Sequence, residues 1–154
     1  MSAIIKRAVQ DAISNIEYQT GVISSLASLE HNELAMAVLG IFENEEYASI
    51  SVSGSSVYVY VTMSGLDGFK DERLVNAMMG LMLACEDWEM ETKDSAEILN
   101  RNFKFSKAIT REDEKRFWTH VTIAAYVRSD SPTCQKVVVG QETKVVDKYE
   151  IICS

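Results

Sequence analysis

Proline and cysteine are scarce in this sequence of 154 residues. The single proline, Pro132, lies in the turn-like stretch SDSPT, and no linker, repeat or low-complexity tract divides the chain. The cysteines Cys85, Cys134 and Cys153 are too few and too scattered for a disulfide framework or a zinc site, so we expect buried thiols in a reducing compartment. The length suffices for a sizeable core, and we expect one domain over residues 1–154.

Long apolar runs are also missing. Lys6, Arg7 and Asp11 place charges where a secretory leader would need an apolar core, and no later run is long enough to cross a bilayer. These absences predict a soluble cytoplasmic protein without a membrane partner.

Basic residues are outnumbered, which gives a net charge of -8 and a pI of about 4.8. This balance argues against a general polyanion binder and favours a basic partner. The charge is also segregated: residues 86–97 hold six acids and one lysine, and the stretch that follows, to residue 116, has an excess of basic side chains.

Helical spacing of apolar residues dominates the first third of the chain. The pattern over residues 3–18 predicts an amphipathic helix, and a second helix is expected from about residue 33 to 43, with Asn32 as its N-cap. The serine-rich stretch between them is ambiguous. Residues 1–46 are therefore expected to form a helical N-terminal part.

From Tyr47 onwards the apolar period becomes two, which predicts a sheet over residues 47–154 with a helix at about 71–87. Gly54-Ser55 suits a type II′ hairpin turn between the first two strands. Further strand candidates follow the helix, among them WEMET, NRNFKFSKAI, RFWTHVTIAAYVR, CQKVVVG and TKVVDKYEIIC. The expected class is α+β: a mostly antiparallel sheet of about five to seven strands, an N-terminal helical pair and one central apolar helix.

The helix expected at residues 71–87 is apolar around nearly its whole circumference, so it must be covered on most sides. One explanation is packing between the sheet and the N-terminal helices, because methionine fills irregular core gaps well. The other is a protein contact, since Met-rich faces adapt to partners. We expect a homodimer whose contact includes Met78, Met79 and Met82.

Acidic residues just after this helix alternate with Trp88, Met90 and Thr92. On a strand they would point to one face and could imitate a row of phosphates for a basic protein groove. The alternative is a solvated edge strand, which charges commonly protect. The predicted partner-binding residues are Asp87, Glu89, Glu91, Asp94 and Glu97.

A second class of function, a single-stranded nucleic-acid-binding sheet, rests on basic residues interleaved with aromatic ones. The overall negative charge opposes it. The residues of this alternative are Arg101, Lys104, Lys107, Tyr58, Tyr60, Trp118 and Tyr126.

Catalytic motifs are incomplete. Glu91-Thr92-Lys93 and Glu142-Thr143-Lys144 have a Glu-x-Lys spacing used by metal-dependent nucleases, but the upstream aspartates are expected to lie too far away to share a metal. His120-Val121-Thr122 is half of a paired His-x-Thr motif, and His31 supplies no second half. We expect no catalytic residues, metal or cofactor.

These observations predict a non-enzymatic acidic interaction protein, an inhibitor, adaptor or chaperone, that binds a basic protein surface. The alternatives are the nucleic-acid-binding sheet and, third, a metal-dependent nuclease or phosphoesterase.

Overall fold

The structure is a computed structural model that describes residues 2–14, 20–28, 32–95, 99–110, 116–141 and 147–154. The helices are α1 (Ala3–Ser14), α2 (Thr20–Ser28), α3 (Glu33–Ile41) and α4 (Glu72–Ala84). The strands are β1 (Tyr47–Ser53), β2 (Ser56–Leu66), β3 (Glu89–Ser95), β4 (Asn100–Thr110), β5 (Arg116–Val127), β6 (Cys134–Gln141) and β7 (Asp147–Cys153).

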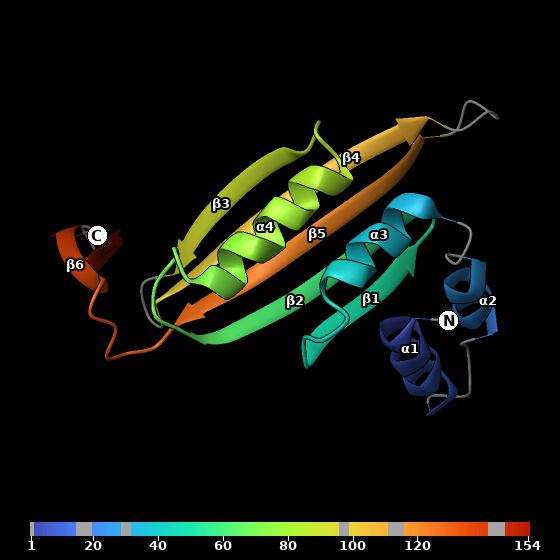
Figure 1. Cartoon of the computed structure of the whole chain (residues 1–154), viewed down its shortest axis with the longest axis horizontal. Coiled ribbons are helices and arrows are strands. Elements are labelled where there is room, and N and C mark those ends of the chain that lie inside the picture. Colours follow the sequence, from blue (N-terminus) through green and yellow to red (C-terminus); the bar gives the residue numbers. More distant parts are fainter. Residues whose placement is uncertain (1, 15–19, 29–31, 96–98, 111–115, 142–146) are drawn as a thin grey trace.

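Five strands form one sheet in the order β1-β2-β5-β4-β3. Only β2 and β5 run parallel in it; its other neighbouring pairs are antiparallel. α3 and α4 lie side by side on one face of the sheet, and α1 and α2 lie beside β1 (Figure 1). β6 and β7 form a separate antiparallel pair. The expected α+β class with a mostly antiparallel sheet is confirmed.

α4 is the crossover that produces the parallel pair. After β2 the chain passes through α4 to the far edge of the sheet, where it enters β3, and then returns through β4 to β5. β3 is therefore an edge strand, paired in this sheet with β4 alone.

Side-chain caps start three of the described helices. The Ser2 hydroxyl accepts hydrogen bonds from the Ile4 and Ile5 N–H groups, at 3.2 Å and 3.4 Å, at the start of α1. The Asn32 Oδ1 atom accepts a hydrogen bond from the Ala35 N–H at 2.9 Å at the start of α3, as expected. The Asp71 Oδ1 atom accepts from the Arg73 N–H at 3.0 Å at the start of α4, which ends at Ala84, three residues earlier than expected. α2 occupies the stretch that the sequence left ambiguous, and residues 15–18 of the first expected helix lie outside the described residues.

The β1–β2 hairpin turns at Gly54-Ser55. Gly54 has φ +59°, whereas Leu99 is the only non-glycine residue with positive φ in the described part of the chain. A type I′ turn needs positive φ at both central positions, so the pair fits the type II′ turn that the sequence predicted.

The core lies between the helices and one face of the sheet. Val57, Val59 and Val61 of β2 are buried on this face, while Tyr58 and Tyr60 point to the opposite face and remain exposed. The largest fully buried side chains include Phe42, Phe105, Leu39, Leu74, Leu81 and Ile123.

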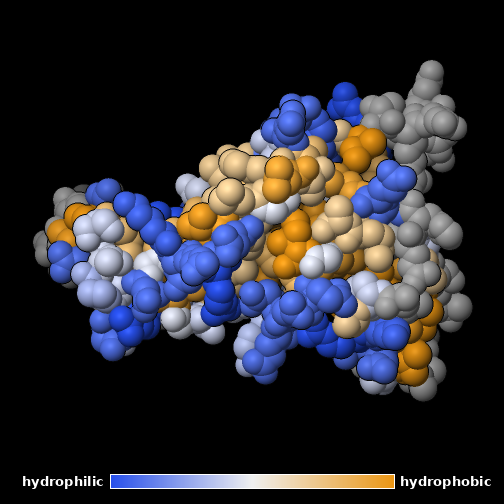
Figure 2. All heavy atoms as spheres, viewed as in Figure 1, coloured by the Kyte–Doolittle hydropathy of each residue, from blue (hydrophilic) through white to orange (hydrophobic). Residues whose placement is uncertain are grey.

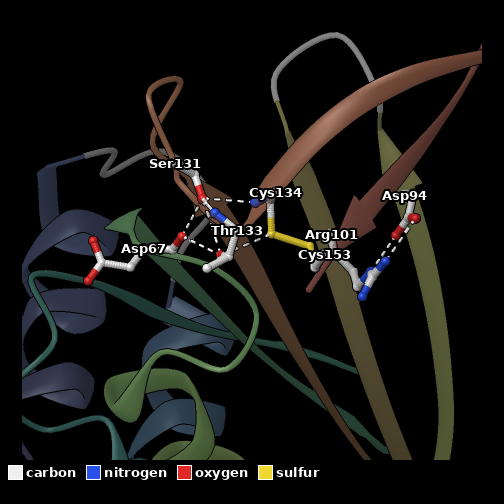
Figure 3. Close-up of a disulfide and its surroundings, with 7 residues drawn as sticks. All are labelled: Asp67, Asp94, Arg101, Ser131, Thr133, Cys134 and Cys153. Atoms are coloured by element: carbon white, nitrogen blue, oxygen red, sulfur yellow. Dashed lines mark hydrogen bonds and ion pairs between the residues drawn. A yellow bond between two sulfur atoms is a disulfide. The ribbon is translucent and has the colours of Figure 1, made fainter.

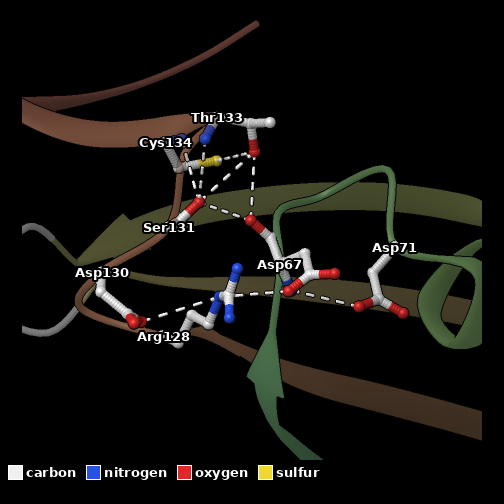
Figure 4. A network of polar contacts seen from close by, with 7 residues as sticks. All are labelled: Asp67, Asp71, Arg128, Asp130, Ser131, Thr133 and Cys134. Atoms are coloured by element: carbon white, nitrogen blue, oxygen red, sulfur yellow. Dashed lines mark hydrogen bonds and ion pairs between the residues drawn. The ribbon is translucent and has the colours of Figure 1, made fainter.

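A polar network joins the loop after β2 to the segment that leads into β6 (Figure 4). The Asp67 carbonyl oxygen accepts hydrogen bonds from the hydroxyls of Ser131 and Thr133. The Ser131 hydroxyl in turn accepts from the backbone N–H of Cys134 at 3.1 Å, and the Asp67 carboxylate pairs with Arg128 at 3.1 Å. These contacts fix where the β6–β7 pair begins.

Gly68, beside this network, leaves no room for a side chain, because a Cβ atom there would overlap the Thr133 hydroxyl. Gly68→Ala is therefore expected to lower the free energy of unfolding by about 2 kcal/mol, as overpacking commonly does. Urea unfolding measures the change. Gly40→Ala is the matched control, since a Cβ atom at Gly40 meets nothing within 4 Å; equal losses in the two variants would contradict the prediction.

The cysteines require a correction. Cys134 and Cys153 form a disulfide (Figure 3). Cys85 is free. The two bonded cysteines are 19 residues apart in sequence, but the pairing of β6 with β7 places them directly opposite each other. The expectation of three reduced thiols is wrong for this pair, so the cysteines no longer support a reducing compartment.

Candidate functional site

The sheet face opposite α3 and α4 carries alternating side chains that are exposed or half-buried; we call it the open face. Strand pairing aligns these side chains in rows across β2, β5, β4 and β3. The first row is Tyr58, His120, Ser106 and Glu89, and the second is Tyr60, Thr122, Lys104 and Glu91.

Three aromatic rings are stacked on the open face. The ring of His120 lies between those of Tyr58 and Trp118, with centroid distances of 4.8 Å and 5.7 Å and an interplanar angle of 9° in each case. Cross-strand pairing places Tyr58 opposite His120, and the two-residue period of β5 places Trp118 on the same face. Tyr58 is 42% exposed, so an outer ring of the stack is available for contact.

Two carboxylates lie on the edge strand β3, on the other side of β4 from the aromatic stack. Glu89 and Glu91 are exposed, and their positions two residues apart put them about 7 Å apart along β3. A shallow hollow of about 490 Å³ lies between them and the aromatic residues. Its lining includes Tyr58, His120, Thr122, Ser106, Lys104, Glu89 and Glu91. The hollow thus joins ring faces, hydroxyls and charges of both signs.

The five acids predicted as one partner-binding row do not share a face. Asp87 precedes β3, and its carboxylate is 3.4 Å from the Lys107 ammonium. Asp94 lies on the helix-bearing side and forms a two-pronged ion pair with Arg101, at 2.5 Å and 3.1 Å. Glu97 lies outside the described residues. Among the described acids of this set, Glu89 and Glu91 lie together on the open face, because Asp87 lies before β3 and the two-residue period of the strand turns Asp94 to the other face.

The residues of the nucleic-acid alternative also divide between the faces. Arg101 and Lys107 point to the helix-bearing side, where both meet acids and the Arg101 guanidinium lies 4.3 Å from the centre of the Phe69 ring. The remaining five lie on the open face: Tyr58, Tyr60, Lys104, Trp118 and Tyr126.

The three methionines predicted for self-association differ in exposure. Met78 is half-buried against the core, whereas Met79 is 57% and Met82 55% exposed. Figure 2 shows hydrophobic side chains gathered over α4 and α3 on the helix-bearing face. The sheet and α3 therefore cover only part of α4.

The stacking of His120 was not predicted from the sequence. The two-residue alternation along β5 indicates that Trp118, His120 and Thr122 share a face, but not which ring lies beside His120. Which aromatic residue lies opposite His120 depends on the parallel β2–β5 pair, and no local pattern reveals that pair. Met90, 52% exposed on the helix-bearing side of β3, was also missed as a surface residue.

Comparison with known protein families, curated proteins and solved structures finds no match for this chain. In the described part of the chain, no helix has the length and apolar character needed to span a membrane.

Proposed function

We propose that the protein is a non-enzymatic interaction protein that binds an extended basic segment of another protein on its open face. The observation that carries this proposal is the aromatic stack of Tyr58, His120 and Trp118 on the same face as the exposed carboxylates of Glu89 and Glu91, with a hollow between them.

The chemistry of this surface suits arginine. A guanidinium group stacks flat on an aromatic ring and also forms charge-assisted hydrogen bonds with a carboxylate. Basic residues two positions apart in an extended segment are about 7 Å apart, which matches the spacing of Glu89 and Glu91. The stack lies two strands away from Glu89 in the same row, about 10 Å across the sheet, so a further arginine of the segment can reach the rings.

The second candidate, single-stranded nucleic acid, is favoured by the gathering of Tyr58, Tyr60, Trp118 and Tyr126 on one face, because bases stack on such side chains. Two features weigh against it. Glu89 and Glu91 would repel phosphates at the border of the same surface, and Arg101 and Lys107 are engaged by acids on the other side.

The test compares three probes: a ten-residue peptide of alternating Arg and Ser, its Glu analogue, and a ten-nucleotide oligothymidine. The two tryptophans report the face used, because Trp118 lies in the stack while the Trp88 indole N–H donates to the Leu81 carbonyl on the helix-bearing side at 2.7 Å. In nitrogen-15 NMR spectra the arginine peptide is expected to shift the Trp118 indole signal and leave that of Trp88 in place. Binding should weaken as salt rises.

Glu89→Gln is expected to weaken arginine-peptide binding about tenfold, because a hydrogen bond to a charged group contributes roughly 1.5 kcal/mol. Glu86→Gln is the matched control, since Glu86 is an exposed acid in the turn before β3 and the charge change is the same. Equal effects of the two variants would contradict the proposal. Tighter binding of oligothymidine than of the arginine peptide would favour the nucleic-acid function instead.

A further inference from the structure

An apolar strip runs along the flank of α4 that faces away from α3. Gly80 marks the flank that packs on α3, because a Cβ atom there would lie 3.2 Å from the Ile41 side chain. The exposed apolar residues occupy the other sides of the helix and continue onto β3. The strip consists of Val75 (37% exposed), Met79 (57%), Met82 (55%), Leu83 (87%) and Met90 (52%).

β3 lies next to this strip and has a free edge. In the described part of the chain it pairs with β4 and also contacts β7, which forms no ladder with it, so its outward-facing backbone N–H and C=O groups are not paired with a strand. Glu91 and Lys93 are exposed on β3, and in the described part of the chain neither forms an ion pair. The edge thus combines unpaired backbone groups with charges of both signs.

We propose that a second copy of the chain occupies this edge, through antiparallel pairing of β3 with β3 about a two-fold axis at Thr92. This register places Glu91 opposite Lys93 of the second copy, and Lys93 opposite its Glu91, so that two opposite-charge pairs form. Pairing centred at Lys93 would set Lys93 opposite itself. Pairing centred at Glu91 would set Glu91 opposite itself, although it would also place Glu89 opposite Lys93. Of these three registers, the one centred at Thr92 forms opposite-charge pairs without a like-charge pair.

The two-fold axis brings the strips of both copies to the same side of the joined sheet, one on each side of the axis. Apolar patches of this kind mark protein contacts. The pairing leaves Tyr58, His120 and Trp118 on the open face of each copy. It shares Glu91 with the proposed site for a basic segment, so the dimer is tested by sedimentation in the absence of any peptide.

A charge swap tests the register. By analytical ultracentrifugation, the unmodified chain is expected to be a dimer at micromolar concentration. Lys93→Glu should raise the dissociation constant about tenfold or more, because the introduced carboxylate then lies opposite Glu91 of the second copy, twice in each dimer. Adding Glu91→Lys should restore the dimer, since the pairs are then reversed and the net charge is again that of the unmodified chain. Lys70→Glu is the control for net charge, because Lys70 is exposed in the loop before α4.

A cysteine on the two-fold axis tests the geometry directly. Thr92→Cys should form a disulfide-linked dimer under mild oxidation, because opposed residues in an antiparallel pair lie within bridging distance. Met90→Cys, on the same face of the strand, should not, since its two copies would be more than about 13 Å apart. Thermal unfolding confirms that each variant folds. A monomeric unmodified chain, a double swap as weak as Lys93→Glu, or equal cross-linking of the two cysteine variants would overturn the proposal, whatever the peptide titration shows.

Discussion

Leu81→Ala is expected to lower the free energy of unfolding by about 3 kcal/mol, whereas Met79→Ala should change it by about 0.5 kcal/mol or less. The two residues lie half a turn apart on α4. Leu81 is fully buried against the core, so its truncation leaves a cavity; Met79 is 57% exposed and leaves none. Urea unfolding of both variants at low protein concentration measures the difference.

Protein concentration provides the control for this comparison. If a second copy covers the strip on α4, the Met79 side chain is buried in the dimer. The loss of unfolding free energy caused by Met79→Ala should then grow as the protein concentration rises through the dimer dissociation constant. The loss of unfolding free energy caused by Leu81→Ala should not depend on concentration. A loss near 3 kcal/mol for Met79→Ala in the monomer would contradict the exposure of that side chain.

Features set by neighbouring residues could be predicted from the sequence. Asn32 caps α3 because its side chain reaches an N–H three residues ahead, and the turn at Gly54 follows from the conformational freedom of glycine. The alternation of Val57, Val59 and Val61 with exposed residues identified the buried face of β2. In each case the determining contacts lie within a few residues along the chain.

Features set by distant residues could not be predicted. The position of β5 beside β2 depends on the α4 crossover and on return through two further strands, and the stack of Tyr58 on His120 follows from that pairing. The cysteine bond has the same origin, since spacing along the chain does not show which strand lies opposite Cys134.

The acidic run shows how a local pattern can mislead about a site. A two-residue period places Glu89 and Glu91 on one face of β3, and the structure agrees. The same period sends Asp94 to the other face, where Arg101 holds it, and Asp87 lies in the turn before the strand. A count of acids therefore overestimates the surface that a basic partner could meet. Ring faces beside two carboxylates form a smaller and more selective site than a row of five charges.

Replacing both Cys134 and Cys153 by alanine is expected to lower the free energy of unfolding by about 3 kcal/mol, because the disulfide closes a loop of roughly 20 residues in the unfolded chain. The cysteines also anchor the β6–β7 pair to the core, where Cys134 is 4% exposed and Ile151 equally buried. Loss of the bond should therefore speed amide exchange first in this pair, including the Ser154 N–H that donates to the Thr133 carbonyl at 2.8 Å.

Cys85→Ala is the matched control, since Cys85 is free and half-buried at the end of α4. Cys85→Ala should lower the free energy of unfolding by about 1 kcal/mol or less, as expected for truncating a half-buried thiol that forms no disulfide. A reducing agent should lower the stability of the unmodified chain and of Cys85→Ala to that of the double variant, and should leave the double variant unchanged. If the unmodified chain is equally stable with and without the reducing agent, Cys134 and Cys153 are unbonded thiols, and the expectation drawn from the sequence regains its support.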